Sequence, residues 1–206
     1  MGPDHPDVAY PLNGLASLYS EQGKYAKAEP LYLRALHIWE QALGTEDQLV
    51  AYPLNNLASL YYLQGKYAEA EPLYQRALRI WEQAYGPDHP QVASPLNGLA
   101  NLYKEQGKYA EAEPLYQRAL RILEQAQVSD DPTVAYSLSG LANLYKKQGK
   151  YAEAEPLYQR ALRIREQALG PNHPRTREVV RNYAMLLRKM GRETEATQLE
   201  ARFPSF

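Results

Sequence analysis

Apolar residues recur near the start of the chain at three- and four-residue spacing, which is the pattern of an amphipathic helix. We therefore predict a first helix over residues 7–22. Gly23 follows this stretch, and a glycine ends a helix at little conformational cost because it readily takes a positive φ. The apolar face of the helix is formed by Leu12, Leu15, Ala16, Leu18 and Tyr19.

A second helix is predicted from about residue 24 to 43, again with apolar residues on one side. Because the link at Gly23 is so short, the two helices must run antiparallel as a hairpin. The apolar side of the second helix is formed by Tyr25, Ala28, Leu31, Tyr32, Ala35, Leu36 and Trp39.

The two-helix pattern returns every 42 residues. The segment GKYAEAEPLYQRAL stands unchanged at 65–78, 107–120 and 149–162, and as GKYAKAEPLYLRAL at 23–36. A fixed period of this size is typical of stacked repeats. We predict one domain over 1–206 with five hairpins, whose first helices begin near residues 7, 49, 91, 133 and 175. The repeats span 7–48, 49–90, 91–132 and 133–174, and 175–206 forms a degenerate C-terminal capping unit.

Loops and prolines punctuate the repeats. GPDHPDVA at Gly2 returns as GPDHPQVA at Gly86 and GPNHPRTR at Gly170, and Gly and Pro interrupt helices. An aspartate such as Asp4 or Asp88 is expected to cap the helix that follows. Each proline inside a helix lacks an N–H donor, so we expect a local bend and one missing backbone hydrogen bond there. These prolines are Pro11, Pro53 and Pro95 in first helices and Pro30, Pro72, Pro114 and Pro156 in second helices.

These units resemble tetratricopeptide repeats. The small and aromatic positions of that family fall on Leu15, Ala16, Tyr19, Ala28, Tyr32 and Ala35. The long second helix, the GPDHP loop and LNNLASLY at 54–61 are similar to the 42-residue variant of kinesin light chains, and near-identical tandem copies resemble bacterial arrays. The resemblance implies an all-α fold. It further implies an α-solenoid of five antiparallel helix hairpins that forms a right-handed superhelix, with the first helices lining a concave groove.

Composition narrows the class of partner. The chain has 206 residues, 45% of them hydrophobic, and a formal net charge of −1, which gives no basis for strong attraction to nucleic acid or membrane. The absence of cysteine excludes disulfides and cysteine-ligated metals. Prolines and charges interrupt every apolar run before the roughly 18 residues of a membrane span, and nothing resembles a signal peptide. We therefore expect a soluble, cytoplasmic protein.

No residue pattern predicts catalysis. The chain has no phosphate-binding loop, no nucleophile elbow and no His-rich metal motif. His5, His89 and His173 lie in loops two repeats apart, too far to share an ion whose bonds are about 2 Å long. We interpret them as turn residues, and we expect no enzymatic activity, no metal and no cofactor.

The family's groove geometry directs attention to first-helix residues outside the apolar stripe. An asparagine offers both a donor and an acceptor, so a row of them can pair with an extended peptide backbone. The alternative is that these side chains are solvated or bond to the neighbouring helix. Basic residues gather toward the C-terminal half, which favours an acidic ligand there, although a solvated charged face is the alternative. The candidate groove residues are Asn13, Tyr52, Asn55, Tyr62, Asn97, Asn101, Lys104, Asn143, Lys146, Arg181 and Arg188.

The sequence thus predicts a protein–protein interaction module or scaffold that binds a peptide or partner protein in this groove. Two alternatives stay open. Nearly identical units have matching ends, so copies could stack head to tail, and the array could instead be a sensor that regulates an attached signalling NTPase.

Overall fold

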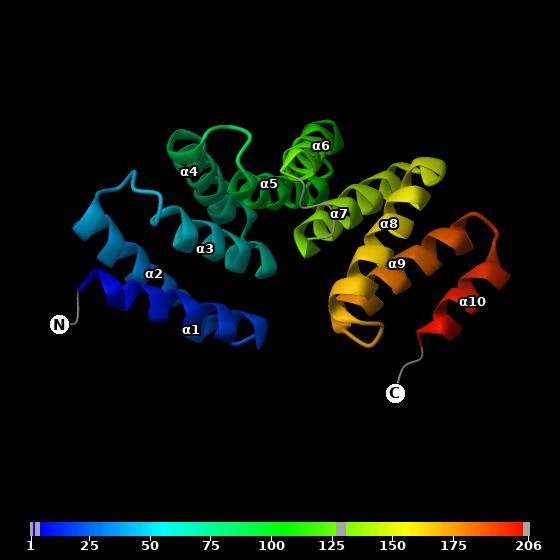
Figure 1. Ribbon diagram of the computed structural model, residues 1–206, viewed down its shortest axis with the longest axis horizontal. Coiled ribbons are helices and arrows are strands. Elements are labelled where there is room, and N and C mark those ends of the chain that lie inside the picture. Colours follow the sequence, from blue (N-terminus) through cyan, green and yellow to red (C-terminus); the bar gives the residue numbers. More distant parts are fainter. Residues whose placement is uncertain (1, 3–4, 127–130, 204–206) are drawn as a thin grey trace. The chain divides into compact units, whose positions relative to one another are not determined.

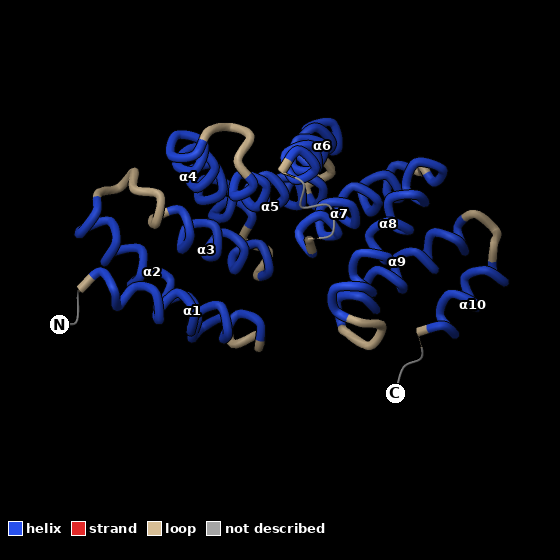
Figure 2. The backbone as a smooth tube through the Cα atoms, viewed as in Figure 1, coloured by secondary structure: helices blue, strands red, loops and turns tan. Residues whose placement is uncertain are grey.

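A computed structural model describes residues 2, 5–126 and 131–203 of the protein. Within these residues the chain forms α-helices and two short 3-10 turns, and no strand (Figure 2). The predicted all-α class is therefore confirmed. The helices are α1 (Ala9–Glu21), α2 (Tyr25–Leu43), α3 (Ala51–Leu63), α4 (Tyr67–Tyr85), α5 (Ala93–Glu105), α6 (Tyr109–Gln125), α7 (Pro132–Gln148), α8 (Tyr151–Leu169), α9 (Pro174–Lys189) and α10 (Glu193–Arg202). The 3-10 turns are η1 (Pro6–Val8) and η2 (Pro90–Val92).

The helices are arranged in two compact units, residues 1–102 and 103–206, and the boundary between them falls within α5. In unit 1, α1 pairs with α2 and α3 pairs with α4 (Figure 1). In unit 2, α7 pairs with α8 and α9 pairs with α10. The second helix of a pair also contacts the first helix of the next, as α2 contacts α3 and α8 contacts α9. This succession is that of a helical solenoid. The prediction of a single domain remains a prediction.

The glycine turn inside each hairpin has the geometry that the sequence predicts. Gly23 has a φ of +71° and Gly65 a φ of +74°, which is the left-handed region that a glycine enters without a Cβ penalty. Beyond the first of these turns, the Lys24 backbone N–H donates to the Tyr19 carbonyl at 2.8 Å, which satisfies one of the orphaned carbonyls at the end of α1. The chain therefore reverses over very few residues.

Alanines allow the two helices of a hairpin to approach closely. Ala16, Ala28 and Ala35 are fully buried in the first hairpin, and their copies are equally buried in the later repeats. A tyrosine of α2, α4, α6 and α8 fills the space beside them, with Tyr32 packed against Ala16, Ala28 and Leu57. The Tyr32 hydroxyl donates to Ser17 Oγ at 3.0 Å, so the buried phenol keeps a polar partner.

Histidines cap η1, η2 and α9, which corrects the expectation of a cap by Asp88, whereas Asp4 lies outside the described residues. His5 Nδ1 accepts from the Asp7 backbone N–H at 3.3 Å, and His89 and His173 do the same for Gln91 and Arg175. The interpretation of these histidines as turn residues is thus confirmed. An aspartate caps only where the histidine is missing, as Asp131 Oδ1 accepts from the Thr133 N–H at 2.6 Å.

The helices continue past their prolines, and the local bend expected at each stays a prediction. Pro30, Pro72, Pro114 and Pro156 lie inside α2, α4, α6 and α8, which all continue past them. Pro11, Pro53 and Pro95 fall in the first turn of α1, α3 and α5. A backbone N–H has no intrahelical partner in that turn, so no hydrogen bond is lost there.

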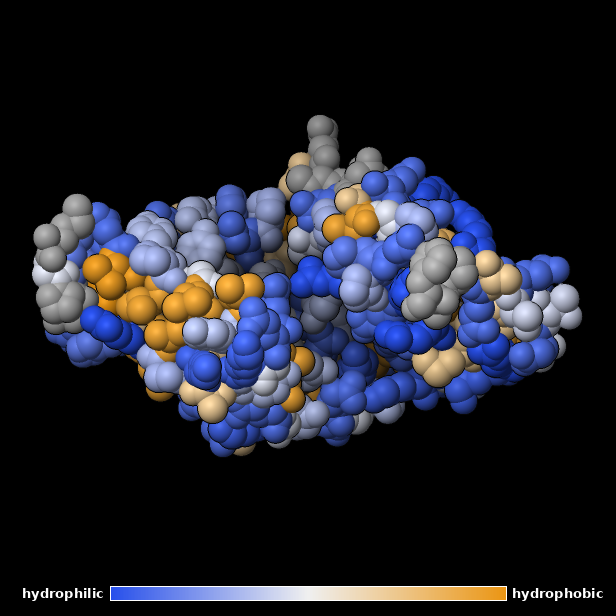
Figure 3. Space-filling model, turned by 90° about the horizontal axis from the view of Figure 1, so that it is seen from below, coloured by the Kyte–Doolittle hydropathy of each residue, from blue (hydrophilic) through white to orange (hydrophobic). Residues whose placement is uncertain are grey.

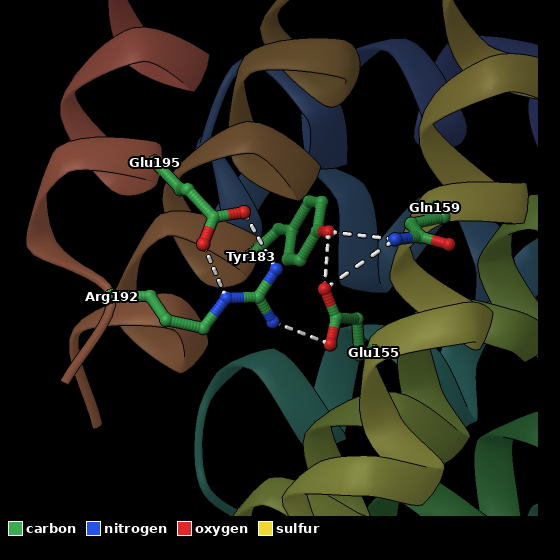
Figure 4. A network of polar contacts seen from close by, with 5 residues as sticks. All are labelled: Glu155, Gln159, Tyr183, Arg192 and Glu195. Atoms are coloured by element: carbon green, nitrogen blue, oxygen red, sulfur yellow. Dashed lines mark hydrogen bonds and ion pairs between the residues drawn. The ribbon is translucent and has the colours of Figure 1, made fainter. Parts of the chain in front are cut away.

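A polar network attaches the last hairpin to α8 (Figure 4). Arg192 donates to Glu155 Oε2 at 2.7 Å and to Glu195 Oε1 at 2.6 Å. The Tyr183 hydroxyl donates to Glu155 Oε1 at 3.0 Å, and Gln159 Nε2 donates to that hydroxyl at 3.0 Å. Glu155 on α8 therefore binds both α9 and the start of α10.

The repeat offers a matched test of how much neighbour packing stabilises the fold. Leu57 is 2% exposed in α3, whereas its copy Leu15 is 41% exposed in α1. We expect Leu57→Ala to lower the free energy of unfolding by about 2–4 kcal/mol, because it leaves a cavity. The same change at Leu15 should cost less than about 1 kcal/mol. Urea denaturation of both variants measures the difference, and equal losses would contradict this account of the packing.

Candidate ligand-binding surface

Asparagine side chains of unit 1 form hydrogen bonds between helices. Asn55 is buried, and its Nδ2 donates to Ser94 Oγ on α5 at 3.2 Å. Asn13 accepts through Oδ1 from Asn56 Nδ2 at 3.2 Å. Asn97 and Asn101, at 1% and 7% exposure, are also buried. Asn13 and Asn55 therefore link neighbouring helices, as in the alternative that the sequence left open, and the buried Asn55, Asn97 and Asn101 present little amide surface to a ligand.

The two tyrosines of the candidate groove pack against other rings. Tyr52 is half-buried and meets Trp81 edge to face, with 5.1 Å between ring centroids. Burial raises the pKa of its hydroxyl, and the neighbouring Tyr85 raises it further. Tyr62 lies 5.7 Å from Tyr67. Both rings therefore lie in aromatic contacts within unit 1.

Lysines converge in unit 2, where α7 lies between the end of α5 and α9. Lys104 is 7% exposed, with its Nζ 3.6 Å from Glu105 Oε1. Lys147 Nζ lies 2.9 Å from the other oxygen of the same carboxylate. Burial would raise the pKa of Glu105, but the hydrogen bond from Lys147 and the charge of Lys104 bring it below its usual value. The Glu105 carboxylate thus pairs with both Lys104 and Lys147.

Lys146 has no carboxylate within ion-pair distance among the described residues. It is half-buried, its Nζ donates to Asn182 Oδ1 at 3.3 Å, and it lies 5.6 Å from the centre of the Tyr158 ring. Burial lowers the pKa of Lys146 to about 8, and the positive charges of Lys104, Lys189 and Lys147 contribute. We call Lys104, Lys146, Lys147 and Lys189 the lysine cluster.

The remaining candidate residues of unit 2 differ in whether their side chains already have partners within the protein. Asn143 is one helical turn before Lys146 on α7 and accepts from the Tyr158 hydroxyl at 2.6 Å. Arg181 is exposed on α9. Arg188 binds both oxygens of Glu200 at 2.8 and 2.7 Å and also Glu193, so α10 already occupies it. The structure therefore brings Lys104, Asn143 and Lys146 to one region and commits Arg188 to the last hairpin.

Sequence reasoning missed two contributors to this surface. Asn182 receives the Lys146 ammonium, and Tyr158 lies beneath the same lysine. Asn182 stands in the row of Gly98 and Gly140, which the sequence analysis did not place in the groove. The one sequence feature that points to Asn182 is Lys146 on α7. It can be recognised only when α7 and α9 are known to be adjacent.

A separate hollow of about 290 Å³ lies between α8, α9 and α10. Its polar groups already serve one another, since Arg202 binds Glu166 at 2.8 and 2.7 Å and Tyr183 binds Glu155. It is lined by Gln159, Leu162, Arg163, Glu166, Tyr183, Leu199 and Arg202.

Among the described residues, no group of three or more His, Asp or Glu side chains could hold a metal ion. None of the helices described is long and apolar enough to cross a membrane.

The paired helices, glycine turns and recurring packing define a helical repeat solenoid, and comparisons with known proteins identify its family. Tetratricopeptide repeat profiles match residues 9–48, 49–125 and 133–202. The chain therefore belongs to the tetratricopeptide repeat family, and its repeats are of the kinesin-light-chain type. Proteins of this family are generally protein–protein interaction modules that bind peptides or proteins, and the fold is typically a non-enzymatic scaffold.

Solved structures support the assignment. BtubC (BKLC) from P. vanneervenii is 27% identical, with a TM-score of 0.78 over 96% of this chain and 78% of its own. A Podosopora anserina protein, described as a kinesin light chain with nearly identical TPR-like repeats, is 25% identical to this chain. Its TM-score is 0.71 over 95% of this chain and 92% of its own. A variant of that protein, at 24% identity and a TM-score of 0.74 over 97% and 94%, shows the same fold. No curated protein matches this chain.

The lysine cluster predicts a specific pH dependence of stability. Because folding lowers the Lys146 pKa from 10.5 to about 8, the unfolded chain binds more protons between these values, and stability rises with pH across that window. We expect Lys146→Met to raise the melting temperature at pH 7 by about 1–4 °C. The difference from wild type should shrink as the pH rises from 8 to 10.5, because the wild-type lysine then loses its charge.

Thermal melts between pH 6.5 and 10.5 measure this effect. Lys66→Met, which removes an exposed lysine of unit 1, is the control. An identical response of the two variants across the pH range would show that the lysine cluster has no special electrostatic cost.

Proposed function

We propose that this protein is an interaction module whose unit 2 binds an acidic peptide segment of a partner protein at the lysine cluster. The observation that carries the proposal is the half-buried Lys146, which lies among three other lysines and hydrogen-bonds to the neutral amide of Asn182. An anionic ligand would relieve this repulsion, because opposite charges within a few ångströms favour the ammonium form.

The balance of charge at the cluster supports an acidic ligand. Glu105 is bonded to Lys104 and Lys147, and Glu178 adds a second, more distant negative charge near Lys104. The charges of Lys104, Lys147 and Lys189 all act on Lys146, which has no carboxylate partner among the described residues. The chain as a whole has a net charge of only −1, so the positive charge is local and suits a short acidic segment better than a long polyanion.

A peptide would also find hydrogen-bonding groups beside the lysines. Asn143 accepts from Tyr158 through Oδ1, and its amide nitrogen donates to no group in the described chain. An asparagine amide can donate to a peptide carbonyl whatever the side chains of the peptide are. Arg181, exposed on α9, adds a fork of donors that suits a carboxylate. The combination favours an extended peptide with acidic side chains.

Fluorescence anisotropy tests this function with a labelled twelve-residue peptide of alternating Glu and Ser, and with a neutral peptide that has Gln in place of Glu. We expect the acidic peptide alone to bind at pH 7. Lys146→Glu should weaken its binding by at least about fivefold, which corresponds to about 1 kcal/mol. Binding should also weaken as the pH rises through and above 8, because Lys146 loses its proton there.

Lys66→Glu makes the same charge reversal on unit 1 and is the matched control. Equal affinity for the acidic and neutral peptides would rule out an acidic ligand. An equal loss of affinity in the Lys66 and Lys146 variants would show that net charge, and not the lysine cluster, attracts the peptide.

A further inference from the structure

One amine of the lysine cluster has surroundings unlike those of the others. Lys104 and Lys147 share the Glu105 carboxylate. Lys146 is half-buried, and its Nζ donates instead to the neutral amide oxygen of Asn182 at 3.3 Å. Its positive charge is therefore disfavoured by burial and by like charges, without a paired carboxylate to offset them.

The groups that act on Lys146 come from four helices, and the charged ones are all positive. Lys104 near the end of α5 and Lys189 on α9 act on its charge, as does Lys147 beside it on α7. From α8, the Tyr158 ring lies beneath it, with 5.6 Å between the ring centre and Nζ. Each of the three charges favours the neutral amine over the ammonium form.

A substantial fraction of Lys146 is a neutral amine near neutral pH. With a pKa of about 8, roughly a quarter of it is unprotonated at about pH 7.5, against about one in a thousand for an ordinary lysine. A lysine that is desolvated or lies next to another cation is activated as a nucleophile in this way. Lower basicity reduces the gain by about tenfold if amines follow the Brønsted relation of thiols, so an advantage of at least about fivefold remains.

The neighbouring lysines select the charge of the electrophile. Lys147 and Lys189 are exposed, and hydrophilic side chains predominate on the face of unit 2 visible at the right of Figure 3. Lysine ammonium groups bind phosphate as point charges. A reagent that carries a phosphate would be held beside Lys146 Nζ by these two groups, and their charge would also stabilise the phosphate as it leaves.

From these observations we propose that Lys146 is a site of acylation by small acyl phosphates, with Lys147 and Lys189 binding the phosphate group. The neutral Nζ attacks the carbonyl carbon, the bond between this carbon and the phosphate oxygen breaks, and inorganic phosphate leaves. The nitrogen, which has gained one bond to carbon, loses one proton to the phosphate or to water. The hydrogen bond to Asn182 Oδ1 uses an N–H of the amine and leaves the nitrogen lone pair for the attack.

Acylation changes the electrostatics of the lysine cluster. The product is a neutral amide, so the repulsion between Lys146 and the other three lysines ends. The acylated protein should therefore melt at a higher temperature at about pH 7, as the Lys146→Met variant should. Acylation should also weaken binding of an acidic peptide by at least about fivefold. This last consequence rests on the proposed function, whereas the reactivity of Lys146 does not.

The experiment measures how fast each lysine of the full chain is acetylated by acetyl phosphate at about pH 7.5. Tandem mass spectrometry of a digest gives the occupancy of each site over time, and fragment ions separate Lys146 from Lys147. We expect Lys146 to react at least about fivefold faster than Lys66 and Lys108. These two are matched controls, because each lies over a tyrosine ring, at 5.2 and 5.3 Å, but is exposed.

Unfolding the chain in guanidinium chloride removes the difference in surroundings, so the rates at Lys146, Lys66 and Lys108 should then converge. Equal rates at these three lysines in the folded protein would overturn the proposal. A rate at Lys146 that stays high in the unfolded chain would also overturn it, because the local sequence and not the fold would then activate the amine.

A double variant, Lys147→Met with Lys189→Met, tests the role of the two exposed lysines. The rate at Lys146 should fall at least about threefold with acetyl phosphate. It should fall less with phenyl acetate, an uncharged acyl donor that has no phosphate to bind. Lys24→Met with Lys66→Met removes two exposed lysines of unit 1 and should leave the rate at Lys146 unchanged. An equal fall with both reagents would overturn phosphate binding by Lys147 and Lys189.

Peptide binding is measured separately, so the two proposals can fail independently. If Lys146 is the fastest site but the acidic peptide does not bind, the proposed function is wrong and the acylation site stands. If the acidic peptide binds but Lys146 reacts no faster than Lys66, the acylation site is wrong and the proposed function stands.

Discussion

The fold depends on first helices being packed on two sides by second helices, as α3, α7 and α9 are. Leu57 and Leu60 are buried because α2 lies on one side of α3 and α4 lies on the other, whereas Leu15 and Leu18 remain exposed on α1. The alanines of each hairpin make the inner contact close, and the tyrosines of the second helices fill the outer one. Stability in such an array is a sum over neighbours, so its two ends need not be alike.

The C-terminal end differs from the α1 end in chemistry. Arg188 and Arg192 bind glutamates of α8 and α10, so ion pairs add to the apolar contacts that attach the last hairpin. Period would place a tyrosine at Leu187 to bind Glu155, but Tyr183, one turn earlier, makes that hydrogen bond instead. The inter-repeat contact is therefore kept while the sequence around it becomes more polar. Such a surface suits a terminal repeat, which must face water.

The lysine cluster makes an unfavourable electrostatic contribution to the stability of unit 2. Burial disfavours the charged form of Lys104 and Lys146, and the lysines repel one another. Glu105 and the Asn182 amide offset only part of this cost. Groups with perturbed pKa values gather at functional sites more often than elsewhere. Proteins of the tetratricopeptide repeat family generally bind peptides or proteins, and this cluster is the site that we propose for an acidic one.

The sequence alone determined the helical hairpins, the period, the glycine turns and the buried alanines, because these follow from local conformational preference and from apolar spacing. It also located Lys104 and Lys146 on first helices. Only the tertiary structure decided that Asn13 and Asn55 bond to other helices, that histidines cap the loops, and that Arg188 is bound to α10. A period fixes where a side chain starts, but the partner it reaches depends on the distance and angle between neighbouring helices, which packing of the whole repeat sets.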